Sequence, residues 1–213
     1  MPATLTVGTT LTELEYIEEI FALPDGAERE LRFRRDPALK QLLPELYRLD
    51  GIPQSPFYHP EGDVLTHTLL AIRHLPPNPD RRLAWGTLFH DLGKAVTTQN
   101  IGGRIRSFGH ARAGIELVTP ILNRLKVPAA TQDDIYWLIR NHMFALDWQV
   151  ESLADLSRRQ WRFIRDPRFP LLLELMRADA MAAGTNPEKL HQVDLYRQAW
   201  QQASAQPGCN PEP

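Results

Sequence analysis

The chain has 213 residues, of which 43% are hydrophobic and 23% charged, a composition typical of a folded globular domain and not of a disordered chain. A formal net charge of −2 argues against a protein whose main task is to grip the nucleic-acid backbone. The single cysteine, Cys209, excludes an internal disulfide framework and a cysteine-based zinc site.

Residues 1–9 and 203–213 carry little apolar content, so we expect two flexible ends around one domain over residues 10–202.

Helical signals dominate the first half of the chain. Caps, prolines and apolar periodicity predict helices from the capping box Thr10–Glu13 to Pro24, from Asp36-Pro37 to Leu43, from Pro44 to Leu49, from Asp63 to Leu75, and from the cap Asn78-Pro79 to His90.

The helical pattern is interrupted at residues 96–108. Val96 to Gln99 and Arg104 to Phe108 flank the turn Asn100–Gly103, which predicts a short β-hairpin. Beyond it, helices are predicted over residues 110–125 with a kink at Pro120, and over residues 129–141, 152–164, 170–182 and 187–202. The predicted fold is therefore all-α, a helical bundle with one short hairpin.

Several histidines and aspartates occupy the apolar sides of these predicted helices. His142 shares a stripe with Ile135, Leu138 and Ile139; Asp179 shares one with Leu172, Leu175 and Met176; and His90 lies on the side of Leu83 and Gly86. A carboxylate on an apolar face is costly unless it is paired or binds a metal. One such residue is ordinarily a satisfied core or capping residue, but several on separate helices match metal sites built inside helical bundles.

The order of these residues resembles the HD superfamily of metal-dependent phosphohydrolases. The ordered set is His67, His90-Asp91, His110, His142 and Asp179, and residues 90–94 contain the HD dipeptide in the segment HDLGK. Further segments are similar to the C-terminal HD domain of bacterial tRNA nucleotidyltransferases: Leu42–Glu45, Gly51–Gln54, His59–Asp63, Thr66–Leu70, Gly109-His110, Arg140–His142 and Arg177–Ala180. The resemblance covers residues 39–184, and the 38 residues before it are too few for a nucleotidyltransferase head. We therefore expect a freestanding HD domain without CCA addition.

The resemblance implies a metal site. In it, His67, His90, Asp91 and Asp179 would bind one divalent ion. His110 and His142 would bind a second ion bridged by Asp91, or would instead hold the substrate phosphate or protonate the leaving oxygen. Nitrogen and carboxylate ligands suit Mn, Fe, Co, Ni or Zn better than Mg.

Two further residues follow the HD dipeptide. Lys94 lies one helical turn past Asp91, where it could reach a phosphate oxygen as a point charge, with a surface lysine as the alternative. Gly93 would let a substrate or a neighbouring helix approach closely.

The implied activity is phosphoester hydrolysis. We predict a phosphodiesterase or phosphatase acting on 2′,3′-cyclic nucleotides, nucleotides or short RNA, through attack of metal-bound hydroxide on phosphorus. Two alternatives stay open: hydrolysis of dinucleoside polyphosphates or nucleoside triphosphates, and a non-catalytic RNA- or partner-binding module. A degraded module should have lost ligands, whereas every position of the set is occupied here, and this favours an enzyme.

The remaining features indicate little about partners. No apolar stretch reaches the ~20 residues of a membrane span and no signal peptide is evident, so we expect a cytoplasmic protein. A homodimer is the commonest soluble oligomer, although no surface patch indicates one, and we expect no stable binding to duplex nucleic acid. We interpret two arginine clusters as solvated faces and Trp137, Trp148 and Trp161 as packing residues; the clusters are Arg29, Arg32, Arg34 and Arg35, and Arg158, Arg159, Arg162, Arg165 and Arg168.

Overall fold

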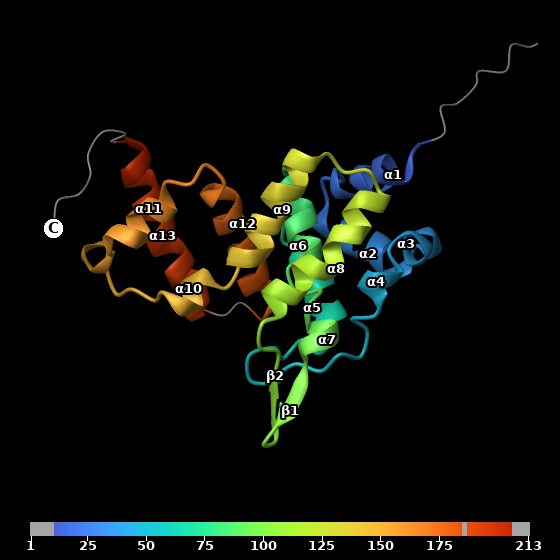
Figure 1. Ribbon diagram of the computed structural model, residues 1–213, viewed down its shortest axis with the longest axis horizontal. Helices are drawn as coiled ribbons and strands as arrows, with labels where there is room; N and C mark the ends of the chain where they lie inside the picture. Colours follow the sequence, from blue (N-terminus) through green and yellow to red (C-terminus); the bar gives the residue numbers. More distant parts are fainter. Residues whose placement is uncertain (1–10, 185–186, 206–213) are drawn as a thin grey trace, which may run out of the picture.

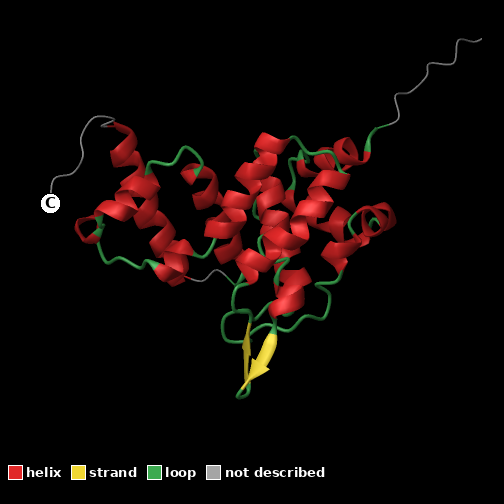
Figure 2. Cartoon of the chain, in the orientation of Figure 1, coloured by secondary structure: helices red, strands yellow, loops and turns green. Residues whose placement is uncertain are grey.

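The computed structural model describes residues 11–184 and 187–205, which fold almost entirely into helices (Figures 1 and 2). In chain order the elements are α1 (Glu13–Phe21), α2 (Gly26–Arg35), α3 (Pro37–Leu42), α4 (Pro44–Tyr47), α5 (Val64–Arg73), α6 (Arg81–Phe89), α7 (Lys94–Thr97), β1 (Gln99–Ile101), β2 (Arg104–Arg106), α8 (His110–Arg124), α9 (Ala129–Asn141), α10 (Phe144–Asp147), the 3-10 helix η1 (Leu153–Asp155), α11 (Arg158–Ile164), α12 (Phe169–Ala182) and α13 (Pro187–Ala205). The predicted all-α class with one short hairpin is confirmed. Of the two ends expected to be flexible, residues 203–205 continue α13, whereas residues 1–9 and 206–213 lie outside the described residues.

The centre of the molecule is built from α5, α6, α9 and α12. Helix α5 packs against α6 and α12, and α6 packs against α9. The apolar stripes predicted for α9 and α12 are buried, as are Leu83 and Gly86 on α6. A Cβ on Gly86 would lie 2.9 Å from Leu138 Cδ1, so glycine is what lets α6 and α9 approach closely there. The polar residues that share these stripes are therefore carried into the interior.

Several predicted boundaries were wrong. The first capping box is formed by Thr12 and Glu15, two residues later than predicted. Helix α6 is capped by Asp80 and not by Asn78-Pro79, because Asn78 takes a left-handed backbone with φ of 47°. The helix predicted over residues 152–164 is broken into η1 and α11, with Ser157 capping the second piece.

Three helices, α2, α7 and α10, were not predicted. Helix α2 has a strongly polar sequence, GAERELRFRR, and therefore lacks the apolar stripe of a surface helix. It is anchored by Phe33 and by Arg29, both fully buried. The Arg29 guanidinium donates to the carbonyls of Leu75 at 2.6 Å and Pro76 at 3.0 Å, so this arginine does not belong to a solvated face.

The hairpin projects from the end of the bundle (Figure 1). Strands β1 and β2 are antiparallel with Gln99 opposite Arg106, and the turn carries Gly102 and Gly103 at positive φ. Strand β1 starts later than predicted because Val96 belongs to helix α7, and it continues to Ile101; β2 ends at Arg106, before the predicted Phe108. Neither strand contains a buried residue.

The C-terminal helices enclose a cluster of aromatic rings. Phe144 lies at its centre, with ring centroids 4.7 Å from Tyr196, 5.1 Å from Phe163 and 5.5 Å from Phe169. Trp137 stacks on Phe163 at 5.4 Å, consistent with its interpretation as a packing residue. No helix within residues 11–184 and 187–205 is long and apolar enough to cross a lipid bilayer.

Candidate metal centre

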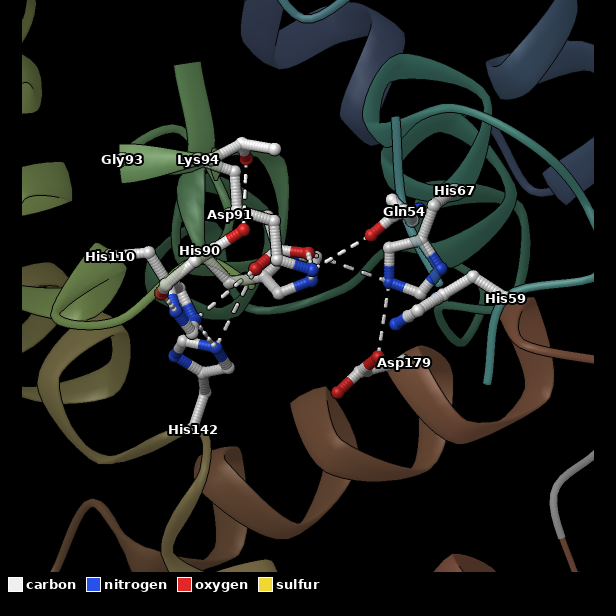
Figure 3. Close-up of polar contacts among 12 residues, drawn as sticks. Gln54, His59, His67, His90, Asp91, Gly93, Lys94, His110, His142 and Asp179 are labelled. Carbon is white, nitrogen blue, oxygen red and sulfur yellow. Dashed lines mark hydrogen bonds and ion pairs between the residues drawn. The ribbon is translucent and has the colours of Figure 1, made fainter. Parts of the chain in front are cut away.

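All six predicted metal ligands meet in the interior of the bundle (Figure 3). They come from five places in the fold: His67 from α5, His90 and Asp91 from the end of α6, His110 from the start of α8, His142 from the end of α9, and Asp179 from α12. Five of the six side chains are at most 4% exposed, and His110 is 11% exposed. The site is therefore buried, with His110 the most accessible of the six side chains.

Three of the histidine rings are oriented by main-chain carbonyls. The Nδ1 atoms of His90, His110 and His142 each lie 2.7–2.9 Å from the carbonyl oxygen three residues earlier in the chain. A neutral ring that donates from Nδ1 keeps its lone pair on Nε2. The local backbone at these helix ends thus fixes both the tautomer and the direction of Nε2, which is the arrangement of metal-bound histidines.

His67 is oriented by a carboxylate instead. Its Nδ1 lies 2.6 Å from Glu61 Oε1, and His59 Nδ1 lies 2.9 Å from the same oxygen. Burial opposes ionisation of Glu61, but hydrogen bonds from His59 and His67 outweigh it and lower the pKa of Glu61 to about 2. Glu61 is therefore an anion behind the His67 ring.

The first cluster consists of His67, His90 and Asp179. Its ligand atoms lie within 4.8 Å of one another, and His67 Nε2 is 3.1 Å from Asp179 Oδ1. The Nε2 atoms of His67 and His90 are buried without a hydrogen-bond partner. Two buried nitrogens without partners, beside a carboxylate, fit a divalent cation, because native proteins rarely leave such atoms unsatisfied.

The second cluster consists of Asp91, His110 and His142. The two Nε2 atoms are 3.1 Å apart, and Asp91 Oδ1 lies 3.4 Å from His110 Nε2 and 3.8 Å from His142 Nε2. Burial, reinforced by the neighbouring His90 ring, lowers the pKa of His142 to about 3, so this ring stays neutral. The second cluster thus offers two imidazoles and one carboxylate.

Asp91 faces both clusters. Its Oδ1 points to the second cluster, whereas its Oδ2 lies 3.4 Å from His90 Nε2 and 3.8 Å from His67 Nε2. Burial alone would raise the pKa of Asp91, but the neighbouring charge of Lys94 and the His90 ring hold it well below its usual range. One ionised carboxylate therefore stands between the two groups of ligands.

Two lysines accompany the carboxylates. Lys94 Nζ is 2.7 Å from both Asp91 Oδ2 and Gln54 Oε1, and Lys189 donates to Asp179. The structure thus places Lys94 at the site, and its predicted contact with a phosphate oxygen stays a prediction. Lys189 keeps the pKa of Asp179 well below its usual range against the opposing effect of burial.

Gly93 brings the HD dipeptide against α8. A Cβ there would lie 2.0 Å from the His110 carbonyl oxygen and 2.5 Å from Gly114 N. Of the two roles considered for this glycine, close approach of a neighbouring helix is confirmed. The contact sets the distance between Asp91 and His110, which come from different elements.

Sequence reasoning did not single out Glu61, Gln54 or Lys189. Glu61 and Gln54 lie in a loop without periodicity, where no pattern separates a functional side chain from a solvated one. The one available signal was their presence in the segments that carry the family resemblance. Lys189 lies on α13, and only the path of that helix shows that it reaches Asp179.

Comparison with known proteins identifies the family. The model of a family described as "HD domain" matches residues 57–184, more than half of the chain. The chain belongs to the HD-domain family. The His/Asp clusters of this HD domain are consistent with a divalent metal site typical of the family.

Curated relatives of this HD domain have names that concern CCA and tRNA. A "Multifunctional CCA protein" of Alkalilimnicola ehrlichii is 34% identical over 79% of this chain and 41% of its own length. An "A-adding tRNA nucleotidyltransferase" of Deinococcus radiodurans is 37% identical over 78% of this chain and 38% of its own length. The chain thus spans about 40% of the length of these relatives.

Proposed function

We propose that this HD domain is a metal-dependent phosphodiesterase or phosphatase in which each cluster would hold one divalent ion and Asp91 would offer one oxygen to each cluster. The observation that supports this most strongly is the convergence of four Nε2 atoms on the two oxygens of Asp91, with each Nδ1 occupied by a carbonyl or carboxylate. The proposed substrates are 2′,3′-cyclic nucleotides, nucleotides and short RNA. The name of the Deinococcus radiodurans relative, which concerns tRNA, supports phosphoesters derived from RNA.

The residues around the clusters suit an anionic substrate. Divalent ions, when bound, supply neutralisation of the phosphoester charge and a water of lowered pKa. Asp91 contributes one oxygen to each cluster, so it would hold the two halves of the site at a fixed separation. Lys94 would turn from Asp91 toward a phosphate oxygen once the carboxylate is engaged elsewhere, adding a point charge at the rim of the site. Four imidazoles favour Mn, Fe, Co, Ni or Zn over Mg.

The test is Mn²⁺-dependent hydrolysis of 2′,3′-cyclic AMP by the wild type and by Asp91→Asn. Because Asp91 faces both clusters, we expect the variant to lose at least about 100-fold in kcat/KM, more than the 10–100-fold expected for residues that only orient ligands. Asp133→Asn, an exposed aspartate on α9 outside the site, is the matched control.

Three results are informative. Loss of hydrolysis in Asp91→Asn but not in Asp133→Asn supports the proposal. Equal turnover by wild type and Asp91→Asn would contradict the assignment of the chemistry to this centre. No turnover by the wild type would remove cyclic nucleotides as the substrate class and favour dinucleoside polyphosphates, nucleoside triphosphates or a binding module.

A further inference from the structure

Exposed hydrophobic side chains gather at one end of the molecule. Among the residues whose exposure the structure describes (11–144, 147–184 and 187–205), large hydrophobic side chains are exposed at seven positions. Five of these lie in only two segments, the loop before α5 and the stretch from α7 to α8: Phe57, Tyr58, Val96, Ile101 and Phe108. Phe57 is 84% exposed and Phe108 is 75% exposed, values that leave these rings almost free of packing. Scattered exposed apolar residues are ordinary, but a concentration of them marks an interaction surface.

Both segments adjoin the candidate metal centre. Phe57 and Tyr58 directly precede His59, whose ring lies 4.7 Å from that of His67. Phe108 comes two residues before the ligand His110. A hydrogen bond of 2.7 Å from Lys94 to Gln54 ties the two segments together, and Figure 1 shows the loop before α5 and the hairpin at the same end of the bundle.

The same stretch is basic. Residues 92–115 contain Lys94, Arg104, Arg106 and Arg112 and no aspartate or glutamate. Within the described part of the chain, Arg104 and Arg106 form no ion pair, although many other arginines do. Their hairpin buries no residue: Arg104 is exposed and Arg106 is half-buried.

We propose that this surface binds the terminal bases and phosphates of a single-stranded oligoribonucleotide and presents its end to the metal centre. We call the surface the basic aromatic rim and define it by Phe57, Tyr58, Arg104, Arg106 and Phe108. The inference rests on the proposed function, since it supplies the substrate class for the same site. Exposed rings stack on unpaired bases, and arginines contact the phosphates between them.

The chemistry of the rim favours single-stranded RNA over a protein partner. Exposed rings beside arginines that form no ion pair are typical of single-strand binding, in which the rings stack on bases and the arginines contribute positive charge. Two arginines can contact only a few phosphates, which agrees with a net charge of −2 for the whole chain. The rim therefore fits a short segment of RNA and not a long duplex.

The experiment measures fluorescence anisotropy of a 5′-fluorescein hexa-adenylate with the full chain in EDTA, so that no hydrolysis interferes. The variants are Phe108→Ser and the double variant Arg104→Ser/Arg106→Ser. Matched controls are Leu31→Ser, another exposed hydrophobic residue, and Arg34→Ser/Arg35→Ser, an exposed arginine pair on α2. Thermal unfolding of each variant establishes that it is folded.

We expect Phe108→Ser to weaken binding at least about fivefold, the smallest effect of removing one stacked base. For the arginine pair we expect the slope of log K against log salt to become shallower by about 1.4, since each phosphate contact to a single strand contributes about 0.7. Both controls should bind as the wild type does. No binding by the wild type, or equal weakening in the controls, would overturn the proposal.

Two further outcomes separate this inference from the proposed function. If the chain binds hexa-adenylate through the rim but does not hydrolyse 2′,3′-cyclic AMP, the rim stands and the proposed mononucleotide activity fails. If it hydrolyses 2′,3′-cyclic AMP but does not bind the oligonucleotide, the rim proposal fails alone. Sedimentation that shows a dimer disrupted by Phe108→Ser, without RNA binding, would assign the surface to a second copy of the chain and also overturn the proposal.

Discussion

The two clusters present similar side chains but differ in the groups to which those side chains are hydrogen-bonded or ion-paired. In the first cluster, the His67 ring donates to the carboxylate of Glu61, and Asp179 is paired with Lys189. In the second cluster, both rings donate to main-chain carbonyls, and the carboxylate is Asp91, which it shares with the first. A carboxylate behind a histidine raises the basicity of the ring more than a neutral carbonyl does.

This difference indicates unequal metal affinity. The first cluster has its own carboxylate and an anion in its outer shell, and its side chains are at most 4% exposed. The second cluster includes His110, the most accessible of the six side chains. We therefore expect the first cluster to bind an ion tightly and the second to bind one weakly, on the side from which a substrate would enter.

The largest expected effect is on metal affinity, in two single variants that each remove one histidine from one cluster. We expect His67→Ala to weaken the tight site by more than about 100-fold, since a direct ligand matters more than the 10–100-fold expected of an orienting residue. His142→Ala should keep the tight site and lose only the weak one. Isothermal titration with Mn²⁺ measures both, together with the number of ions bound per chain. Loss of both sites in His142→Ala would show that the clusters do not act separately.

The next effect concerns Glu61. Glu61→Gln keeps a hydrogen-bond acceptor for His67 Nδ1 but removes the charge, so affinity at the first cluster should fall about 10–100-fold while the second changes little. The same titration measures it, with Glu116→Gln as the control because Glu116 is exposed on α8. An equal decrease at both clusters would contradict the assignment of Glu61 to the first.

The sequence was enough to predict which histidines and aspartates meet in the interior, but not the residues that contact them from outside the clusters. His142 and Asp179 share apolar stripes with residues that proved buried, and this periodicity is visible in one dimension. Glu61 acts from a loop, and Lys189 reaches Asp179 from a separate helix, so both depend on chain paths that no local pattern encodes. The sequence therefore did not predict that the two clusters differ in the residues that contact their ligand side chains.

The same division applies to the fold. Helix α9 matches its predicted bounds, because its apolar stripe is regular and Pro128 precedes it. Helix α2 was missed because its helical state depends on tertiary contacts, with Arg29 bonded to carbonyls beyond α5. Gly26 at its start looks like a helix breaker, yet a Cβ there would lie 1.9 Å from Arg73 O. Local propensity gives the wrong result where packing decides.

A smaller effect should follow from Gly93→Ala. The added Cβ would meet His110 O at 2.0 Å, so α7 or α8 must move, and we expect a loss of about 1–3 kcal/mol in the free energy of unfolding. Because the shift separates Asp91 from His110, the weak site should be lost before the tight one. Urea unfolding and Mn²⁺ titration measure the two consequences.

The control for this prediction is Gly102→Ala. Gly102 has φ of 58°, and a Cβ added there would meet no heavy atom within 4 Å, so alanine carries only the backbone penalty of about 1 kcal/mol. Its metal binding should equal that of the wild type. An intact weak site in Gly93→Ala would contradict the role of Gly93 in setting the distance between Asp91 and His110.

The smallest effect is a pH dependence in the metal-free protein. The pKa of His142 is about 3 in the folded state, against 6.5 for an unperturbed histidine, mainly because of burial. Below pH 6.5 the His142 ring therefore binds a proton in the unfolded chain but not in the folded protein. The free energy of unfolding thus falls with decreasing pH until about pH 3. Between pH 7.5 and 5.5 this ring should lower the free energy of unfolding by about 1.4 kcal/mol. Over the same interval, the free energy of unfolding of His142→Asn should fall by about 1.4 kcal/mol less than that of the wild type. Urea unfolding in EDTA at the two pH values measures the difference. Parallel losses in the two proteins would mean that His142 titrates normally, and that the second cluster is more solvated than its burial indicates.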